Sequence, residues 1–432
     1  MKKKILQTQP YKGTKDWYPE DLQERNFIFD TWIKVAQRYG YEEYDTPLLE
    51  EASLYRVKSG DEIANNQLYS FKDKGNREVA IRPEMTPSLA RLVAKRKNEL
   101  TFPLRWFNIG KYYRYERPQK GRNREFFQLN IDILGVSEIS AEVEIIQYIT
   151  DVMREFKAPK ESYELRISSR DLLNYLFDEI IKVEKEMRKK LSRALDNYLK
   201  MEENLFKAYL EELGLNREQV EKILGFLNWE ISDLKNIQNE SKGAKQLVEL
   251  FEILDRLNTP SVVFSPSIVR GLAYYTGIVL EMFEVKQGER PRAMFGGGRY
   301  DNLLEIFGKE KIPAFGLGWG DETTLNFLKY NNLLPQYSNN IDIFVCLMDN
   351  KLLTETLSLT SFLRSKDLNV LQQLKTIKLS KQIKYADRKK IPYIAILGED
   401  ELNKGVIQIK DMNSRNSFLI KKEDIIAKMN GS

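Results

Sequence analysis

The chain has 432 residues, of which 42% are hydrophobic and 30% are charged, and its 68 basic and 63 acidic side chains leave a net charge of +5. This composition indicates a globular protein with two or three domains and excludes a disordered or membrane-embedded chain. The chain has no histidine and one cysteine. A histidine general base, a Ser-His-Asp or Cys-His nucleophile and an intrachain disulfide are therefore excluded, and no metal site made by the protein alone is expected.

The N-terminal part mixes strand and helix patterns up to about residue 167. Its first ten residues, Met-Lys-Lys-Lys-Ile-Leu-Gln-Thr-Gln-Pro, are basic but contain no apolar run. We therefore expect no secretory signal and a cytoplasmic protein. A helix is predicted over residues 22–39, with Gly40 as its stop signal.

Residues 112–135 predict a β-hairpin. Apolar and polar side chains alternate from Phe127 to Ile133, which places Gln128, Asn130 and Asp132 on one face and the apolar side chains on a core face. The same period predicts that Tyr112, Arg114 and Glu116 share one side of the incoming strand. The connecting residues contain Pro, Gly and several arginines, and arginine suits bidentate contact with phosphate. The hairpin is therefore predicted either to hold a polyphosphate or to be a solvated charged loop.

Strand patterns disappear between about residues 168 and 262. Runs such as residues 172–213 carry alternating charges around leucines, which is typical of amphipathic helices. We expect an all-helical insertion here, after which the first domain resumes over residues 263–330.

A polar linker over residues 331–340 precedes a different pattern. Apolar runs at 341–348, 368–374 and 393–397 alternate with helical stretches, which predicts a small α/β domain with a largely parallel sheet over residues 341–432. Cys346 lies in the first run and is expected to be a buried strand residue. Residues 380–390 predict a lysine-rich helix, a pattern that more often marks a solvated face than a nucleic-acid contact.

Residues 114–128, Arg-Tyr-Glu-Arg-Pro-Gln-Lys-Gly-Arg-Asn-Arg-Glu-Phe-Phe-Gln, resemble motif 2 of the class II aminoacyl-tRNA synthetases in its histidyl form. Segments 11–16, 82–86, 268–277 and 295–301 resemble further parts of the same family in the same order, and 379–401 resembles its anticodon-binding domain. Residues 41–49, with Pro47, resemble motif 1, which forms the family's dimer interface.

The resemblance implies an architecture and an activity. The fold would be an α+β catalytic core with an antiparallel sheet (residues 1–167 and 263–330), a helical insertion domain that grips the acceptor arm of the tRNA (168–262), and an α/β anticodon-binding domain (341–432). The reaction would join L-histidine to tRNA(His) with ATP and Mg²⁺, in a homodimer that does not enter a membrane.

The resemblance also assigns roles to individual residues. The predicted ATP-binding residues are Arg114 at the α-phosphate, Arg122 at the γ-phosphate, Phe126 stacked on adenine, and Glu116. The predicted histidine-binding residues are Glu84, Thr86, Gln128, Asp132, Arg270, Tyr274 and Tyr275. Arg270 and Arg114 are the predicted catalytic residues. The predicted tRNA-binding residues are Arg117, Gln119, Lys381, Lys384 and Arg388. A neutral imidazole donates at one nitrogen and accepts at the other, so pairing the Asp132 carboxylate with the Tyr275 phenol suits histidine.

The chain departs from the family pattern at several positions. Glutamate is usual where Asp132 stands, aspartate where Ala273 stands and glycine where Met85 stands. Residues 316–323 resemble motif 3 of the family, but Thr323 stands at the position that usually supplies an ATP-binding arginine. Asp321 is expected to cap the following helix, whose N-terminus is itself able to receive phosphate.

Two alternatives stay open. A non-catalytic regulatory or binding paralogue would share the core, although the known kind lacks the anticodon-binding domain. A class II synthetase for proline, threonine or glycine would share the motifs, but residues 270–275, Arg-Gly-Leu-Ala-Tyr-Tyr, favour histidine.

Overall fold

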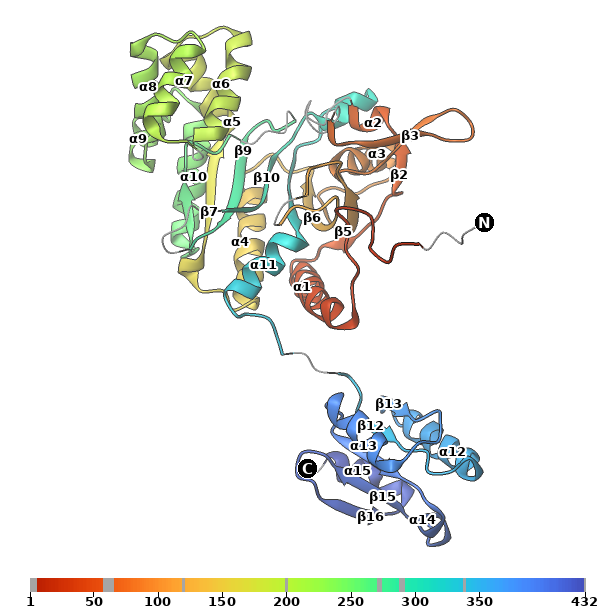
Figure 1. The fold of residues 1–432 in the computed structure, drawn as a ribbon. Coiled ribbons are helices and arrows are strands. Elements are labelled where there is room, and N and C mark those ends of the chain that lie inside the picture. Colours follow the sequence, from red (N-terminus) through yellow and green to blue (C-terminus); the bar gives the residue numbers. More distant parts are fainter. Residues whose placement is uncertain are drawn as a thin grey trace. The chain divides into compact units, whose positions relative to one another are not determined.

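The fold was analysed in a computed structural model, which describes residues 6–56, 66–118, 121–198, 201–269, 274–286, 292–336 and 339–430. The chain forms two compact units, Met1–Pro335 and Gln336–Ser432 (Figure 1). Each unit has its own sheet and hydrophobic core.

The first unit is built on an eight-stranded sheet of order β1-β5-β6-β11-β10-β9-β7-β8. The five inner pairs are antiparallel, and the two edge pairs, β1 with β5 and β7 with β8, are parallel. The predicted antiparallel core is therefore confirmed. The strands are β1 (Glu42–Glu43), β5 (Leu104–Tyr113), β6 (Glu125–Leu134), β7 (Tyr163–Ser169), β8 (Val262–Phe264), β9 (Ile278–Glu284), β10 (Arg292–Arg299) and β11 (Ala314–Gly320).

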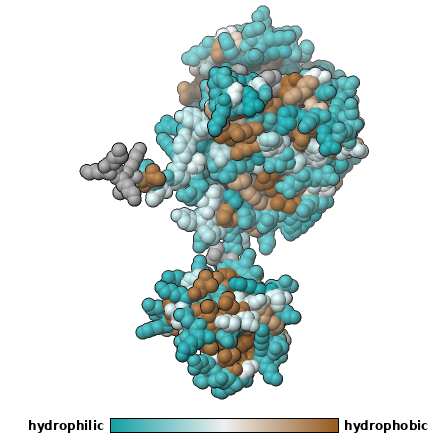
Figure 2. All heavy atoms as spheres, turned by 90° about the vertical axis from the view of Figure 1, so that its right-hand side faces the viewer, coloured by the Kyte–Doolittle hydropathy of each residue, from teal (hydrophilic) through white to brown (hydrophobic). Residues whose placement is uncertain are grey.

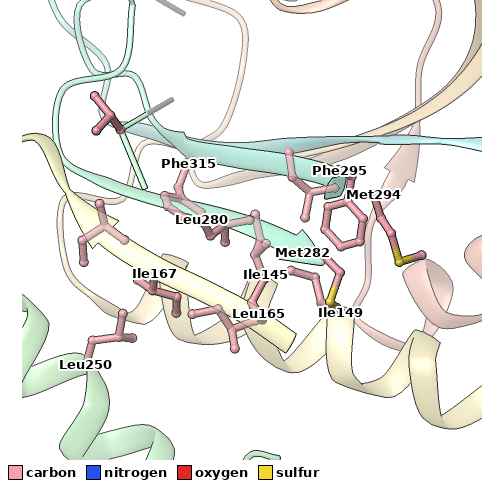
Figure 3. Close-up of a cluster of buried hydrophobic side chains, with 14 of the residues drawn as sticks. Ile145, Ile149, Leu165, Ile167, Leu250, Leu280, Met282, Met294, Phe295 and Phe315 are labelled. Atoms are coloured by element: carbon pink, nitrogen blue, oxygen red, sulfur yellow. The ribbon is translucent and has the colours of Figure 1, made fainter. Parts of the chain in front are cut away.

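Helices cover one face of this sheet. They are α1 (Pro19–Arg38), α4 (Ser140–Glu155), α10 (Lys242–Arg256) and α11 (Asp321–Tyr330). The first helix begins three residues before its predicted start, because Pro19 occupies its first turn and the Asp21 side chain accepts a hydrogen bond from the Tyr18 backbone. Figure 3 shows apolar side chains of α4, α10 and four strands meeting on this face, among them Ile145, Leu250 and Leu280.

The first unit also contains a smaller antiparallel sheet of order β2-β4-β3. Its strands are β2 (Leu49–Glu51), β3 (Tyr69–Lys72) and β4 (Glu78–Ile81), and it is accompanied by α2 (Ser53–Arg56) and α3 (Thr86–Arg96). Thr86, a predicted histidine-binding residue, is the first residue of α3.

Between β7 and β8, all regular elements within the described residues are helices. They are α5 (Arg170–Tyr175), a π-helical turn (Leu176–Ile180), α6 (Lys185–Asn197), α7 (Glu203–Glu212), α8 (Arg217–Leu227), α9 (Ile231–Ile237) and α10. Figure 1 shows α6 to α9 grouped together. The last helix of the segment, α10, packs against α9 and α5 and also onto α4, β7 and β9, so it joins these helices to the core under the sheet.

The second unit contains a five-stranded sheet of order β13-β12-β14-β15-β16. Its strands are β12 (Ile343–Val345), β13 (Val370–Gln372), β14 (Tyr393–Ile396), β15 (Ile407–Asp411) and β16 (Ser417–Ile420), and its helices are α12 (Leu353–Arg364), α13 (Leu379–Arg388), α14 (Glu399–Asn403) and α15 (Ile425–Asn430). The first three strands are parallel, but β14, β15 and β16 pair antiparallel. The expectation of a largely parallel sheet is thus wrong for half of the strand pairs.

Cys346 follows β12 directly and is fully buried. Burial raises the pKa of its thiol to about 12, so the side chain stays protonated. Hydrophilic side chains cover most of the face shown in Figure 2, with hydrophobic patches on both units. Across the described ranges, no helix combines the length and apolar character that a membrane crossing requires.

Candidate active site

The face of the eight-stranded sheet opposite the helices has a floor of glycine. Glycines recur at every second position in parts of β10 and β11 and so fall on this face, where the register pairs Gly298 with Gly316 and Gly296 with Gly318. A Cβ atom on Gly316 would lie 2.0 Å from the Asp132 Oδ1 atom. A Cβ atom on Gly318 would lie 2.3 Å from the Gln128 Nε2 atom. Glycine therefore allows the polar side chains of β6 to lie across the neighbouring strand.

Asp132 is the acidic group of this face. It stands opposite Gly316 in the register and is 4% exposed. Its Oδ1 atom accepts a hydrogen bond from the Tyr300 hydroxyl group. Burial raises the pKa of Asp132 to about 7, while the bond from Tyr300 acts in the opposite direction. The carboxyl group therefore changes its charge near neutral pH.

Tyr275 and Asp132 lie above neighbouring glycines. The Tyr275 ring covers Gly298, since a Cβ atom there would lie 2.8 Å from the Tyr275 Cδ1 atom. Gly298 is the direct cross-strand partner of Gly316, over which Asp132 lies. The phenol and the carboxyl group predicted to act on one imidazole are thus brought to adjacent positions of the same face.

Tyr274 joins this face to the start of α3. Its hydroxyl group donates to the Glu84 Oε2 atom at 3.1 Å and lies 3.5 Å from the Thr86 Oγ1 atom. The Tyr274 and Tyr275 rings are 4.9 Å apart and belong to a buried apolar cluster. The two tyrosines therefore serve the core as well as the predicted site.

A chain of hydrogen bonds fixes Gln128. Its Nε2 atom donates to Asn130 Oδ1 at 2.6 Å, Asn130 donates to the Tyr112 hydroxyl at 2.8 Å, and that hydroxyl donates to Asn108 Oδ1 at 3.0 Å. Asn108 in turn donates to the Asp45 carboxylate at 3.1 Å. Sequence reasoning placed Tyr112 and Asn130 on polar strand faces but gave no role to this network. The asparagines within apolar strands were its only sequence signal.

Arg82 anchors the other end of the network. Its Nη1 atom donates to Asp45 Oδ1 and to the Thr46 carbonyl, both at 2.8 Å, and its Nε atom donates to the Lys111 carbonyl at 3.1 Å. The ion pair of Arg82 is therefore made with Asp45.

The predicted phosphate-binding hairpin is present, but Arg114 and Glu116 lie beyond the end of β5. The strand stops at Tyr113, because the Tyr115 amide donates to the Gln67 carbonyl outside the hairpin. Arg114 donates from Nε to the Pro83 carbonyl at 3.0 Å, and its guanidinium carbon lies 5.1 Å from the Phe126 ring centre. The predicted α-phosphate ligand and the predicted adenine platform are therefore neighbours.

The tip of the hairpin carries Arg122. Its side chain is 71% exposed, and its Nη1 atom lies 3.9 Å from a Glu116 oxygen. Three residues named from the sequence lie outside the described residues, namely Gln119, Arg270 and Ala273.

Thr323, at the position where the family has an arginine, is hydrogen-bonded to the backbone. Its hydroxyl group donates to the Met294 carbonyl at 2.9 Å and lies 3.1 Å from the Gly320 carbonyl. Asp321 is the first residue of α11 rather than its cap, and its Oδ1 atom accepts from the Phe127 amide at 3.0 Å and the Glu322 amide at 2.8 Å. It joins the helix start to β6, and burial raises its pKa to about 7.

The residues predicted to contact tRNA are exposed where they are described. Lys381, Lys384 and Arg388 share the solvent face of α13, whose opposite face buries Gln382 and Ala386. Arg117 is exposed near the tip of the hairpin. Within the described ranges, no three acidic or cysteine side chains gather closely enough to hold a metal ion.

Known proteins resemble the chain over its full length. Residues 13–320 match the family model described as Histidyl-tRNA synthetase, and residues 342–431 match that of an Anticodon binding domain. The chain is 40% identical over 432 residues to the histidine–tRNA ligase of Leptospira biflexa, with 99% of both chains covered. It is 36% identical over 427 residues to the chloroplastic/mitochondrial histidine–tRNA ligase of Arabidopsis thaliana, covering 98% of this chain and 87% of that relative. The crystal structure of histidyl-tRNA synthetase from Nostoc sp. PCC 7120 has a TM-score of 0.83 and 24% identity, with coverage of 99% and 100%.

The buried carboxyl group predicts a pH-dependent stability. The pKa of Asp132 is about 7 in the folded chain and near its ordinary acidic value in the unfolded chain. The folded state therefore holds the Asp132 proton more tightly than the unfolded state does. The stability gained in this way is fully present below the ordinary pKa of aspartate and is lost as pH rises to 7. Relative to Asp132→Asn, the wild-type free energy of unfolding should fall by about 1.4 kcal/mol per pH unit between pH 5 and 7 and then level off.

Urea titrations followed by tryptophan fluorescence test this, because all five tryptophans belong to the first unit. Asp321 is present in both proteins, so its own titration cancels in the difference. A difference that stays constant from pH 5 to 8 would show that Asp132 ionises at its ordinary pKa.

Proposed function

The chain belongs to the histidyl-tRNA synthetase family, and from this premise we propose that it is a histidine–tRNA ligase. The observation that carries the choice of amino acid is the placement of Asp132 and Tyr275 over the paired glycines Gly316 and Gly298. A carboxylate accepts from one imidazole nitrogen while a phenol donates to the other. Asp132 belongs to β6, and the Tyr275 ring lies over Gly298 of the neighbouring part of the sheet.

The reaction has two steps. A carboxylate oxygen of histidine attacks the α-phosphorus of ATP, and pyrophosphate leaves with the electrons of the broken bond. A hydroxyl group of the terminal ribose of tRNA(His) then attacks the carbonyl carbon of the adenylate, and AMP leaves as the hydroxyl proton is lost. Since the substrate carboxylate is already a nucleophile, positioning and neutralisation of phosphate charge are what the protein must supply.

The hairpin would supply the ATP contacts. Arg114, held by the Pro83 carbonyl beside Phe126, is proposed to contact the α-phosphate while the ring of Phe126 stacks on adenine. Arg122 is proposed to reach the γ-phosphate, beside Glu116. This contact matters more here, because Thr323 brings no cation to motif 3. The Mg²⁺ ion would enter with ATP as part of the substrate and neutralise phosphate charge.

The histidine would lie over the glycine floor. Glu84 and Thr86, linked through Tyr274, and Gln128 at the end of its hydrogen-bond chain are proposed to hold the amino group. The proposed role of Arg270 at the α-phosphate rests on the family resemblance alone. Deprotonated Asp132 is the form that accepts from the imidazole, so histidine binding should strengthen as pH rises through about 7.

The two alternative functions receive less support. A regulatory paralogue would not need an anticodon-binding domain, yet residues 342–431 match one. A synthetase for proline, threonine or glycine would not need a carboxyl group and a phenol over the same floor.

The tRNA is proposed to contact both units. The helices between β7 and β8 would hold the acceptor arm, and the exposed basic face of α13 would bind phosphates of the anticodon region and so position the tRNA without reading its sequence. We also propose a cytoplasmic location. A buried free cysteine as the chain's only thiol suits a reducing compartment.

The first prediction from the proposed function concerns activation. Purified protein should exchange pyrophosphate into ATP with histidine and with none of the other nineteen amino acids. Arg114→Ala should lower the exchange turnover by about 100-fold, because it removes charge stabilisation at the reacting phosphate. Arg38→Ala, which breaks only a surface ion pair with Glu155, is the matched control and should leave turnover unchanged. Exchange driven by another amino acid would contradict the proposal.

The second prediction separates the units. Because the chain divides after Pro335, a protein ending there should retain histidine-dependent exchange and lose aminoacylation by at least about tenfold, as phosphate contacts are removed. The triple variant Lys381→Ala, Lys384→Ala, Arg388→Ala should also lose aminoacylation and retain exchange, and its tRNA binding should depend less on salt concentration. A folded truncated protein that aminoacylates normally would refute the role of the second unit.

The third prediction concerns assembly. We propose an isologous homodimer through the motif 1 region, where Leu48 and Leu49 are exposed and β1 has only two residues. Sedimentation should give twice the chain mass of 50.7 kDa. Leu49→Asp should shift the protein toward the monomer, whereas Leu257→Asp, at an exposed leucine just after α10, should not. A fully active monomer would exclude this assembly.

A further inference from the structure

Tyr44 carries a buried hydroxyl group that the site described above does not use. The residue follows β1, and its backbone is fixed to β5, because its amide donates to the Phe107 carbonyl at 2.9 Å and its carbonyl accepts from the Asn108 Nδ2 atom at 2.7 Å. The ring is partly exposed, but the hydroxyl oxygen is buried and has no hydrogen-bond partner within the described part of the chain.

Packing alone does not explain a tyrosine at this position. A phenylalanine would fill the same space with the same ring, whereas a buried hydroxyl group without a partner destabilises the folded state. Buried polar groups are paired in nearly all cases, so an unpaired one in a native chain points to a role beyond folding.

The Tyr44 ring lies on the site face of the sheet. It packs on Trp106 with ring centres 5.5 Å apart, and Trp106 is the direct cross-strand partner of Asp132. Side chains of direct partners project from the same face. Tyr44 also packs against the apolar cluster that contains Tyr300. Burial raises the pKa of the Tyr44 hydroxyl well above its ordinary value, and the nearby charge of Asp132 raises it further.

Other groups around Tyr44 and Asp132 already have partners. Within the described residues, the titratable and charged ones are Asp45, Arg82, Tyr112, Tyr274, Tyr275 and Tyr300. The hydroxyl groups of Tyr112, Tyr274 and Tyr300 each donate a hydrogen bond, and Asp45 is paired with Arg82. The Asp132 carboxyl group is bound at Oδ1 by Tyr300, and no further hydrogen bond reaches it from the described residues. Its second oxygen is therefore an acceptor available to Tyr44.

A hydroxyl group suits both charge states of a carboxyl group. It accepts from the protonated form and donates to the ionised form, and the hydrogen bond to the ionised form is the stronger one. A phenol beside a buried carboxyl group therefore favours ionisation and opposes the effect of burial.

We propose that Tyr44 is a specificity-determining residue whose hydroxyl group donates to the second oxygen of the Asp132 carboxylate when that group ionises. The bond keeps Asp132 in the form that accepts from an imidazole N–H group. The inference rests on the proposed function, in which Asp132 binds the side chain of histidine.

The first test compares Tyr44→Phe with the wild type in histidine-dependent pyrophosphate exchange from pH 6 to pH 9. Loss of the donor should raise the pKa of Asp132 by about one unit, which lowers its ionised fraction about tenfold at acidic pH. The KM for histidine of the variant should therefore be about tenfold that of the wild type at pH 6 and within about twofold of it at pH 9. Turnover at saturating histidine should stay within about twofold. The titration of histidine itself cancels in this ratio.

The second test needs no substrate. The free energy of unfolding of Tyr44→Phe is compared with that of the double variant Tyr44→Phe, Asp132→Asn. Their difference should level off about one pH unit higher than the difference between the wild type and Asp132→Asn, because Asp132 keeps its proton to higher pH.

The matched control for both tests is Tyr41→Phe. Tyr41 is a buried tyrosine three residues earlier, 4% exposed, and it packs beside Tyr148 in the core that the helices cover. This variant should leave unchanged both the KM for histidine and the pH at which the unfolding difference levels off.

Either of two results would overturn the proposal. A KM ratio that is the same at pH 6 and pH 9 would show that Tyr44 only shapes the pocket, and an unchanged levelling pH would show that its hydroxyl group does not bind Asp132. Failure of the proposed function is distinguishable, because the wild type would then show no histidine-dependent exchange while the unfolding experiment would still decide whether Tyr44 binds Asp132.

Discussion

The close approach between β6 and the glycine rows of β10 and β11 is the constraint on which the site depends. Asp132 lies flat over Gly316 and Gln128 over Gly318, in space that any Cβ atom would occupy. The opposite face of the same strands is bulky, with Phe295 stacked on Trp319 at 4.0 Å. One alternating pattern therefore supplies both a packed core below the sheet and a polar, glycine-floored face above it.

A buried ion pair holds this arrangement in register. Arg299, the last residue of β10, points to the helix-covered face and donates from Nε and Nη2 to the Glu142 carboxylate of α4, both at 2.6 Å. Its neighbour Tyr300 points to the other face and donates to Asp132. The orientation of the acidic group in the site is thus tied to a helix behind the sheet, because two consecutive residues of one chain segment project in opposite directions.

The sequence predicted the parts of the site that follow from local periodicity. Alternation from Phe127 to Ile133 was enough to place Gln128 and Asp132 on one face, since the side-chain direction in a strand depends only on parity. The bond between Tyr300 and Asp132 joins residues 168 positions apart, and no local pattern encodes such a contact. The end of β5 at Tyr113 was missed for a related reason, because the hydrogen bond from the Tyr115 amide to the Gln67 carbonyl is set by tertiary structure.

The second sheet shows the same limit. Strands β12 and β14 were visible as continuous apolar runs because both of their faces are buried, but β15, Ile-Gln-Ile-Lys-Asp, buries one face only and reads as a polar segment. Loss of the arginine at Thr323 was plain from the sequence. That its hydroxyl group would be bound to the Met294 carbonyl required the structure.

The placement of Cys346 makes the two units separately observable. The thiol is fully buried and its pKa is about 12, so it does not react with alkylating reagents while the second unit is closed. Every tryptophan belongs to the first unit and the only thiol to the second. Alkylation rate and tryptophan emission, recorded on one unmodified sample, therefore report the opening of one unit and the unfolding of the other, without any label or engineered residue.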